Sequence, residues 1–512
     1  MHPPARAVHR APATESGAIM RPLTQANIGT GFFKPVFFIN GLVLVILAVT
    51  MLIPATVDLI ADSEDILLFP SAAGITLFAG GSLFFGNYSV PMQLSRHQII
   101  LITVSVWVVV PLFAALPFDF GPTRLSLTNA IFESMSGMTT TGSTVITEID
   151  ALSPGIQLWR GILQWLGGLG IMVVSFGILP VLQVGGMEIF RIEAFDIGEK
   201  IVPRIAVTAV WLVVVYIVLT VTCGVLLRLA GMTGLEATVH ALTTIATGGF
   251  STSDQSISHF DSALIEAIIT GGMIAGGLPF MLILAASQGN VRKLFTDSQV
   301  RWYFGILSAG MMLVSAWLFL KQGMPFGQAF RYASFQIASI MTGTGFASTD
   351  YQQWGPVPVI LLFFLTFVGG CTGSTACGIK VFRVCILVSV VNAELKKVMS
   401  PHGVFPAFFN SQPVQSHVAK SVLVFLAAFL FIFALITLGL GLTGLDFTTA
   451  ISSAATAISN VGPGLGSIVG PAGNFASLPD AAKWLLIAGM LIGRLEVITV
   501  IALLTQTFWQ DV

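Results

Sequence analysis

Ten apolar stretches, separated by short polar segments, run through the sequence of 512 residues. They lie at 35–57, 68–86, 98–117, 156–182, 205–230, 262–287, 302–320, 356–390, 418–443 and 481–508. Each is long enough, or nearly so, to cross about 30 Å of hydrocarbon as an α-helix. Only 9% of the residues are charged, whereas soluble domains carry about 25%. The sequence therefore predicts an all-α polytopic membrane protein and excludes a soluble enzyme, a disordered chain and a fibrous protein.

The distribution of Lys and Arg predicts the orientation in the membrane. Ten crossings place both termini on one side, where sixteen Lys and Arg residues fall, against six on the other side. Because basic loops stay in the cytoplasm, we expect cytoplasmic N- and C-termini. Residues 1–31 lack the early apolar core of a signal peptide and are interpreted as a cytoplasmic tail. The four cysteines lie in apolar segments without a CxxC pair, which favours buried thiols over disulfides or metal ligands.

A short glycine-containing segment recurs four times on the predicted outer side. The copies are TTTGST at 139–144, ATGGFS at 246–251, TGTGFA at 342–347 and SNVGPG at 459–464. Their aligned glycines, called the anchor glycines below, are Gly142, Gly249, Gly345 and Gly462, and they are 107, 96 and 117 residues apart. Such a period indicates a repeated structural unit.

Each anchor glycine has the same surroundings. An apolar span comes first, followed by an amphipathic stretch at 125–138, 235–245, 327–341 or 446–458, which as a helix reaches only halfway across a bilayer. A second span with a glycine cluster follows 22 to 33 residues after the anchor. The predicted fold is therefore four pseudo-symmetric units of span, half-helix, glycine loop and span around one pore, after two leading helices.

The predicted boundaries follow from this unit. They are a tail at 1–32, two leading transmembrane helices at 33–90, and the four pore repeats at 91–190, 191–291, 292–395 and 396–512.

Irregular backbone at membrane depth is tolerated only where it lines a cavity or is buried in protein. Four such loops around one axis predict a ring of carbonyl oxygens that replaces the hydration shell of a cation. Oxygen ligands without carboxylates suit a large monovalent cation. The alternative is close helix packing by glycine, which does not explain the shared position in each repeat. The candidate ion ligands are Thr139, Thr140, Thr141, Gly142, Ala246, Thr247, Gly248, Gly249, Thr342, Gly343, Thr344, Gly345, Ser459, Asn460, Val461 and Gly462.

The four glycine segments, together with GGCTGSTACGIKVFR at 369–383 and GRLEV at 493–497, resemble the Trk/Ktr/HKT superfamily of potassium transporters. Within it the chain is most similar to the bacterial TrkH/TrkG branch, over about residues 33–508. The resemblance implies K⁺ uptake across the bacterial inner membrane, with K⁺ as the ion in the filter. The fourth repeat is the most divergent, because Asn460 and Pro463 depart from the other three copies.

Two further features are candidates for a gate. Glycine and small polar residues between 369 and 378 are poor helix formers, so we expect this stretch to be unwound. The resemblance implies an intramembrane gating loop there, and close helix packing is the alternative. The candidate gating residues in this loop are Gly370, Cys371, Thr372, Gly373, Ser374, Thr375 and Gly378.

Arg494 is the second candidate. It lies 32 residues after its anchor glycine, and Gly378 lies 33 residues after its own, so the two should sit at a similar depth. A cavity-facing arginine would repel cations, and a buried salt bridge that stabilises the bundle is the alternative. Glu496 is not expected to be its partner, because residues two apart face different sides of a helix.

The resemblance also implies partners. It suggests a homodimer in lipid, controlled by a cytosolic nucleotide-binding subunit of the TrkA type, and we expect no organic cofactor and no nucleic acid. The chain has no Walker motif of its own. A Na⁺-dependent KtrB-like transporter is one alternative. A polytopic membrane enzyme is another, although no span carries a cluster of ionisable residues that would support it.

Overall fold

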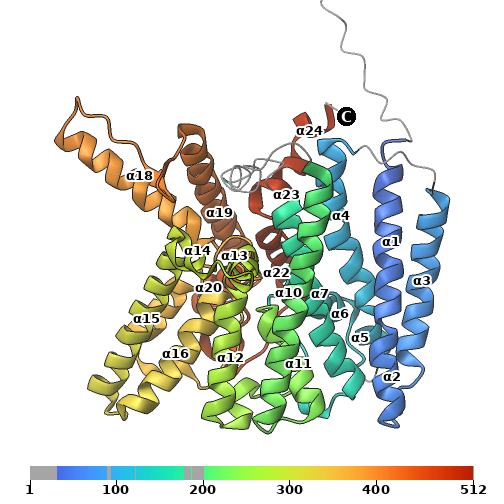
Figure 1. Cartoon of the computed structure of the whole chain (residues 1–512). Coiled ribbons are helices and arrows are strands. Elements are labelled where there is room, and N and C mark those ends of the chain that lie inside the picture. Colours follow the sequence, from blue (N-terminus) through green and yellow to red (C-terminus); the bar gives the residue numbers. More distant parts are fainter. Residues whose placement is uncertain (1–30, 89–93, 122, 178–185, 187–200, 511–512) are drawn as a thin grey trace, which may run out of the picture.

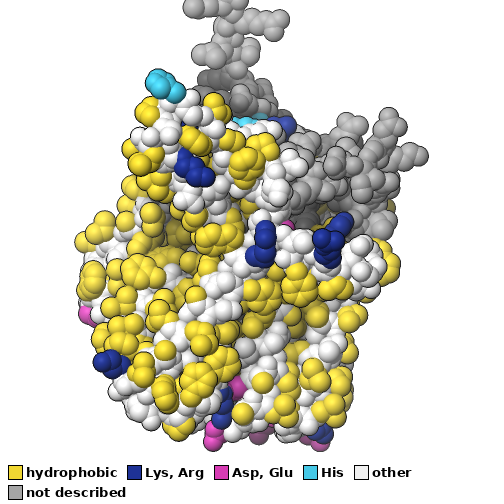
Figure 2. Space-filling view, turned by 60° about the vertical axis from the view of Figure 1, so that its left-hand side comes forward, with side chains coloured by type: hydrophobic (Ala, Val, Ile, Leu, Met, Phe, Trp, Pro, Cys, Tyr) yellow, Lys and Arg dark blue, Asp and Glu magenta, His cyan; other side chains and the backbone are white. Residues whose placement is uncertain are grey.

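The computed structural model describes residues 31–88, 94–121, 123–177, 186 and 201–510. These residues form an all-helical bundle, as predicted, with one small addition. A two-residue antiparallel pair, β1 (Phe408–Phe409) and β2 (Gln412–Pro413), lies outside the helices. The start of α1 and the last helix, α24 (Gln506–Gln510), lie at the same end of the bundle (Figure 1). Hydrophobic side chains cover much of the face in Figure 2, and acidic side chains lie mainly at its lower edge.

The leading helices pack through glycine. They comprise α1 (Lys34–Thr50), α2 (Leu52–Ile60) and α3 (Leu68–Gly86), and α1 lies beside α3 at one edge of the bundle (Figure 1). A Cβ added at Gly80 of α3 would lie 2.8 Å from the Leu44 Cβ and 3.0 Å from the Gly41 carbonyl oxygen. Small residues let two helix backbones approach in this way, which favours packing in a membrane.

Four short helices match the predicted half-helices to within two residues. They are α6 (Leu127–Met138), α11 (Gly234–Ile245), α16 (Phe326–Thr342) and α20 (Phe447–Ser459). In three of them the N-cap side chain accepts a hydrogen bond from a backbone N–H of the first turn; these residues are Ser126, Thr233 and Asp446. The fourth, α16, begins after Pro325. Caps of this kind satisfy the free N–H groups at a helix start.

The span that precedes each half-helix is a continuous helix. These are α4 (Arg96–Ala114), which is followed by α5 (Leu116–Phe120), α10 (Ile201–Leu229), α15 (Ser298–Gln322) and α19 (Ser416–Leu442).

The spans that follow the half-helices differ from one another. The first, α7 (Pro154–Gly177), is unbroken, and its N-terminus is held by Asp58, which accepts from the Gly155 N–H at 2.7 Å. The second bends by 102° between α12 (Ala263–Gly276) and α13 (Phe280–Ser287). The fourth bends by 112° between α22 (Asp480–Arg494) and α23 (Val497–Leu504). The third is interrupted by residues 366–380, between α17 (Pro356–Leu365) and α18 (Val381–Met399).

These breaks interrupt three of the ten predicted apolar stretches. In the part of the chain that is described, seven helices are long and apolar enough to cross a membrane, or nine if each bent pair is one span. The predicted stretch 356–390 is not one helix, because the glycine-rich segment 369–378 does not sustain helical hydrogen bonding.

The remaining elements are short. They are α14 (Val291–Thr296), α21 (Gly466–Val469), η1 (Ile149–Ala151), η2 (Ser256–Phe260) and η3 (Tyr351–Trp354).

Gly80→Ala tests the packing of the leading helices. The new methyl group would press on Leu44 and on the α1 backbone, so we expect a loss of about 1–3 kcal/mol in stability. The control is Gly81→Ala, because Gly81 has no atom within 4 Å of an added Cβ and alanine favours the helix. Thermal unfolding in detergent should show a lower Tm for the first variant only; equal Tm values would contradict the close approach.

Candidate ion pathway

The four half-helices end in the same backbone turn. The residue two before each anchor glycine is left-handed: Thr140, Thr247 and Asn460 have φ of 52°, and Gly343 has φ of 77°. The next residue donates its N–H to a carbonyl five residues back, with lengths of 2.8–2.9 Å in all four repeats. This is the Schellman ending of a helix, in which glycine normally occupies the left-handed position.

Three of these left-handed positions carry a side chain that disfavours the conformation. A left-handed non-glycine residue costs on the order of 1–3 kcal/mol, and the cost is highest for a β-branched residue such as Thr140 or Thr247. Such strain persists only where the surroundings determine the backbone, and it is frequent at ligand-binding sites.

The four loops close into a ring in chain order. A Cβ added at Gly142 would lie 2.2 Å from the Gly248 carbonyl oxygen, and one at Gly249 would lie 1.9 Å from the Thr344 carbonyl oxygen. A Cβ added at Gly345 would lie 2.7 Å from the Gly462 amide nitrogen. A Cβ added at Gly462 would lie 3.3 Å from the nearest carbonyl oxygens of the first loop, which closes the ring. At the first three contacts only glycine fits, because a Cβ would overlap the neighbouring backbone.

The fourth loop departs from the others, as its sequence does. Gly142, Gly249 and Gly345 have φ between 83° and 85°, whereas Gly462 does not share this positive φ. The Gly462 carbonyl oxygen accepts a hydrogen bond from the Ser143 hydroxyl at 2.9 Å. The ring is therefore uneven in its backbone.

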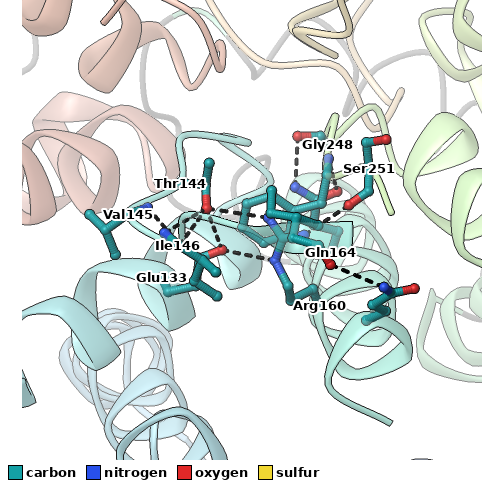
Figure 3. A network of polar contacts seen from close by, with 11 residues as sticks. Glu133, Thr144, Val145, Ile146, Arg160, Gln164, Gly248 and Ser251 are labelled. Atoms are coloured by element: carbon teal, nitrogen blue, oxygen red, sulfur yellow. Dashed lines mark hydrogen bonds and ion pairs between the residues drawn. The ribbon is translucent and has the colours of Figure 1, made fainter. Parts of the chain in front are cut away.

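A buried ion pair supports the first and second loops from outside the ring (Figure 3). Glu133 of α6 accepts from Arg160 Nε of α7 at 2.9 Å, and both side chains are almost fully buried. Glu133 also accepts from the Val145 N–H at 2.9 Å, and Arg160 donates to the Ser251 carbonyl at 2.8 Å. Sequence analysis did not predict this ion pair. The sequence signal that could have indicated it is a single charged residue of opposite sign on each of two neighbouring, mostly apolar segments.

The anchor glycines face one pocket. All four line it, together with Ser143, Ser251 and Asp254. Burial raises the pKa of the Asp254 carboxyl above its ordinary value, while the Ile149 N–H that it accepts opposes this shift. The pocket forms a mouth of the ring, lined by both polar and apolar residues.

The glycine clusters of the second spans lie against the ends of the half-helices. A Cβ added at Gly167 would lie 1.9 Å from the Met138 carbonyl oxygen, and one at Gly493 would lie 2.0 Å from the Ile458 carbonyl oxygen. Packing therefore accounts for these clusters, although it does not account for the ring itself.

The segment 366–380 is unwound, as predicted, and lies against the ring. The Thr375 hydroxyl is 3.4 Å from the Thr247 hydroxyl, and the Cys377 sulfur is 3.4 Å from the Thr140 hydroxyl. Cys377 also lies under the third loop, because a Cβ at Gly343 would be 3.3 Å from its Cβ. The segment thus touches the left-handed residue of three loops.

The rest of the segment is fastened to the second repeat. The Cys371 N–H donates to the Gly277 carbonyl at 2.9 Å, and the Gly373 carbonyl accepts from the Phe280 N–H at 2.9 Å. These bonds satisfy backbone groups that the break between α12 and α13 leaves free. Gly370, Thr372, Ser374 and Gly378 lie in the same segment, and Gly378 has φ of 72°.

Arg494 reaches this segment from the fourth repeat, at the depth that the repeat alignment predicted. Its side chain is 4% exposed. Its guanidinium donates to the Cys377 sulfur, to the Thr375 carbonyl at 3.4 Å and to the Gly167 carbonyl at 3.4 Å. Among the residues that the structure describes, no carboxylate forms an ion pair with Arg494.

A second buried ion pair joins the broken second spans of the third and fourth repeats. Sequence analysis did not predict it. Arg383, in the first turn of α18, donates to Glu496 Oε2 at 2.7 Å. Glu496 lies at the break between α22 and α23 with φ of 64° and ψ of 118°, a conformation that strains a non-glycine residue. The guanidinium of Arg383 also stacks on Phe425 at 3.7 Å from the ring centroid.

Comparisons with known proteins agree with this architecture. The profile of the TrkH family, described as cation transport protein, matches residues 71–511. The Trk system potassium uptake protein TrkI of Halomonas elongata is 41% identical over 481 residues, which cover 94% of this chain and 97% of that protein. The Trk system potassium uptake protein TrkH of Escherichia coli is 36% identical over 94% of this chain and 100% of its own length.

A solved structure is similar over nearly the same length. The crystal structure of the potassium transporter TrkH from Vibrio parahaemolyticus has a TM-score of 0.86 and 36% identity, and the match covers 93% of this chain and 99% of that one. These findings confirm the resemblance seen in the sequence. The chain therefore belongs to the TrkH family of cation transport proteins, which are multi-pass membrane transporters and not enzymes.

Proposed function

We propose that this protein carries K⁺ across the bacterial inner membrane through the ring of four glycine loops. The closed circuit of contacts between the anchor glycines is the observation that carries the proposal. The named relatives are potassium uptake proteins. Carbonyl and hydroxyl oxygens held in such a ring can replace the hydration shell of a K⁺ ion.

Four pore repeats with the boundaries expected from sequence form this pathway in the proposal. The filter ligands are the residues from three before each anchor glycine to the anchor itself. The half-helices stop just before them, so their C-terminal partial negative charges face the ion. The termini are cytoplasmic, and the outer pocket admits the ion from the opposite side.

The unwound segment 366–380 and Arg494 form the gate in this proposal. The segment touches three of the four loops, and Arg494 adds a positive charge on the same side of the ring. At an effective dielectric of about 20, two unit charges ~4 Å apart repel by about 4 kcal/mol. The contacts of Arg494 with carbonyl oxygens and a thiol, rather than with a carboxylate, favour a barrier over a structural salt bridge.

A cytosolic TrkA-type nucleotide-binding subunit and a homodimeric assembly complete the proposal. They rest on the family resemblance. Helix α18 extends away from the bundle (Figure 1) and exposes Leu395, Val398 and Met399, which makes it a surface for such contacts.

Uptake of ⁸⁶Rb⁺ or K⁺ into proteoliposomes tests the function. We expect K⁺-selective flux that continues when Na⁺ is removed and pH is varied separately. Flux that requires Na⁺ would instead support a KtrB-like coupled transporter, and the absence of cation flux from folded protein would overturn the proposal.

Gly345→Ser tests the filter. The added Cβ would lie 2.7 Å from the Gly462 nitrogen at a φ of 83°, so one quarter of the ring should turn out of line. We expect lower K⁺ over Na⁺ preference, measured by competition with ⁸⁶Rb⁺ uptake. Gly323→Ser is the control, because Gly323 also has a positive φ of 67° but no atom within 4 Å. An unchanged ion preference in Gly345→Ser would remove this residue from the filter.

Shortening residues 370–377 tests the gating segment. If the segment blocks the path, K⁺ flux in the absence of any partner subunit should rise. Thr375→Ala is a milder second variant, since it removes the hydroxyl bonds to the Ile245 and Gly276 carbonyls at 2.8 and 3.0 Å. Stable variants that conduct no faster would leave the segment a packing element.

Arg494→Ala tests the barrier. Faster K⁺ flux at normal expression and Tm is expected, while Arg494→Lys should conduct slowly because it keeps the charge. Lys483→Ala is the control, since Lys483 is a buried cation in the same helix whose ammonium binds the Ala476 carbonyl instead. Lost expression or a large fall in Tm for Arg494→Ala without faster flux would favour a structural role.

A further inference from the structure

The second loop differs from the other three in the residues that flank or occupy its left-handed turn position. In the first and third loops two threonine hydroxyls bond each other at 2.7 Å, in the pairs Thr139–Thr141 and Thr342–Thr344. In the fourth loop the Asn460 amide donates to the Met490 carbonyl at 2.9 Å. The corresponding residues of the second loop that flank Thr247 are Ala246 and Gly248, which have no polar side-chain atom.

Gln164 supplies the missing support from the first repeat (Figure 3). It lies on α7 and is fully buried. Its Nε2 donates to the Gly248 carbonyl oxygen at 2.7 Å, and its Oε1 accepts from the Phe250 N–H at 3.0 Å. One side-chain amide therefore holds the backbone on both sides of the anchor Gly249.

Gln164 also accounts for the glycine before that anchor. A Cβ added at Gly248 would lie 2.4 Å from the Gln164 side-chain carbon and oxygen. The space that a threonine side chain occupies in the first and third loops is thus filled here by the glutamine. One turn earlier on the same face of α7, Arg160 donates to the Ser251 carbonyl at 2.8 Å. The helix therefore binds the backbone of the second loop at three residues, Gly248, Phe250 and Ser251.

No other repeat has an equivalent side chain. Gln164 lies 22 residues after its anchor, and the residues at the same offset in the other repeats are Gly271, Phe367 and Trp484. None of these has an amide that could both donate to and accept from a backbone. The support of the second loop by its neighbour is therefore a particular feature of the first repeat and not a consequence of the repeated unit.

We propose that Gln164 is a positioning residue for ion selectivity, which acts by fixing the direction of the Gly248 carbonyl. The inference rests on the proposed function of the ring as the filter. Gly248 lies between the strained left-handed Thr247 and Gly249, which has φ of 83°, so the Gly248–Gly249 peptide that carries this carbonyl is free to turn once its partner is removed. A turned carbonyl would leave one quarter of the ring without its ligand oxygen.

The experiment compares ⁸⁶Rb⁺ uptake into proteoliposomes with K⁺ and Na⁺ as competitors. Gln164→Leu keeps a similar volume and removes both hydrogen bonds, and we expect a fall in K⁺ over Na⁺ preference of roughly tenfold, equivalent to about 1.4 kcal/mol. The control is Trp165→Phe, the next residue of α7. The hydrogen bond that it loses, to the Thr220 hydroxyl at 3.1 Å, does not go to a loop, so its ion preference should stay unchanged.

A rescue variant separates positioning from general support of the bundle. Gln164→Ala combined with Ala246→Thr and Gly248→Thr removes the glutamine and installs the hydroxyl pair of the first and third loops in the space it leaves. We expect most of the K⁺ preference to return. If Gln164→Leu does not fold, Gln164→Glu keeps the shape and the bond from Phe250 but loses the donor to Gly248, and it should show the same loss.

The outcomes distinguish this inference from the proposed function. Gly249→Ala alters the ring directly, because its Cβ would lie 1.9 Å from the Thr344 carbonyl oxygen. If the wild type does not prefer K⁺ over Na⁺, the filter proposal fails. If Gly249→Ala lowers the preference while folded Gln164→Leu or Gln164→Glu keeps it, the filter stands and the role of Gln164 is overturned.

Discussion

The left-handed turn at the end of each half-helix is the constraint on which the rest of the structure depends. It reverses the chain inside the bundle and brings each anchor glycine against the backbone of the next loop. Contacts this close leave no room for a Cβ, and threonine or asparagine at the turn adds strain. The turn persists only because each loop is held from outside, and much of the buried polar chemistry of the protein serves that purpose.

The supports differ from loop to loop, so the ring is uneven in its environment as well as in its backbone. Hydroxyl pairs hold the first and third loops, while the second depends on Gln164 and Arg160 of the preceding repeat. The fourth lacks the positive φ at its anchor, and Ser143 binds its carbonyl. A single chain can specialise each quarter of a ring in this way, whereas four identical subunits would carry the same residue at every position.

The second spans show how broken helices can be accommodated in a membrane. The break between α12 and α13, the unwound segment 366–380 and the break between α22 and α23 all lie on the same side of the ring, where each supplies partners to another. Backbone groups without water must be paired within the protein, so these breaks depend on one another. The Arg383–Glu496 ion pair and the contacts of Arg494 join the third and fourth repeats at this level, so movement of one broken span would disturb the other.

Much of the fold was predictable from the sequence, because apolar length and glycine periodicity report directly on the membrane and on the repeat. The half-helices were located to within two residues, the unwound segment was expected from its poor helix formers, and Arg494 was placed beside it by repeat alignment alone. The bends in the second and fourth repeats were not located from the sequence, because hydropathy does not register a bend between two apolar helices. Tertiary structure alone decided which side chains hold the ring. Gln164 meets Gly248 across 84 residues and Arg383 meets Glu496 across 113, and such pairings follow from packing geometry that local sequence does not encode.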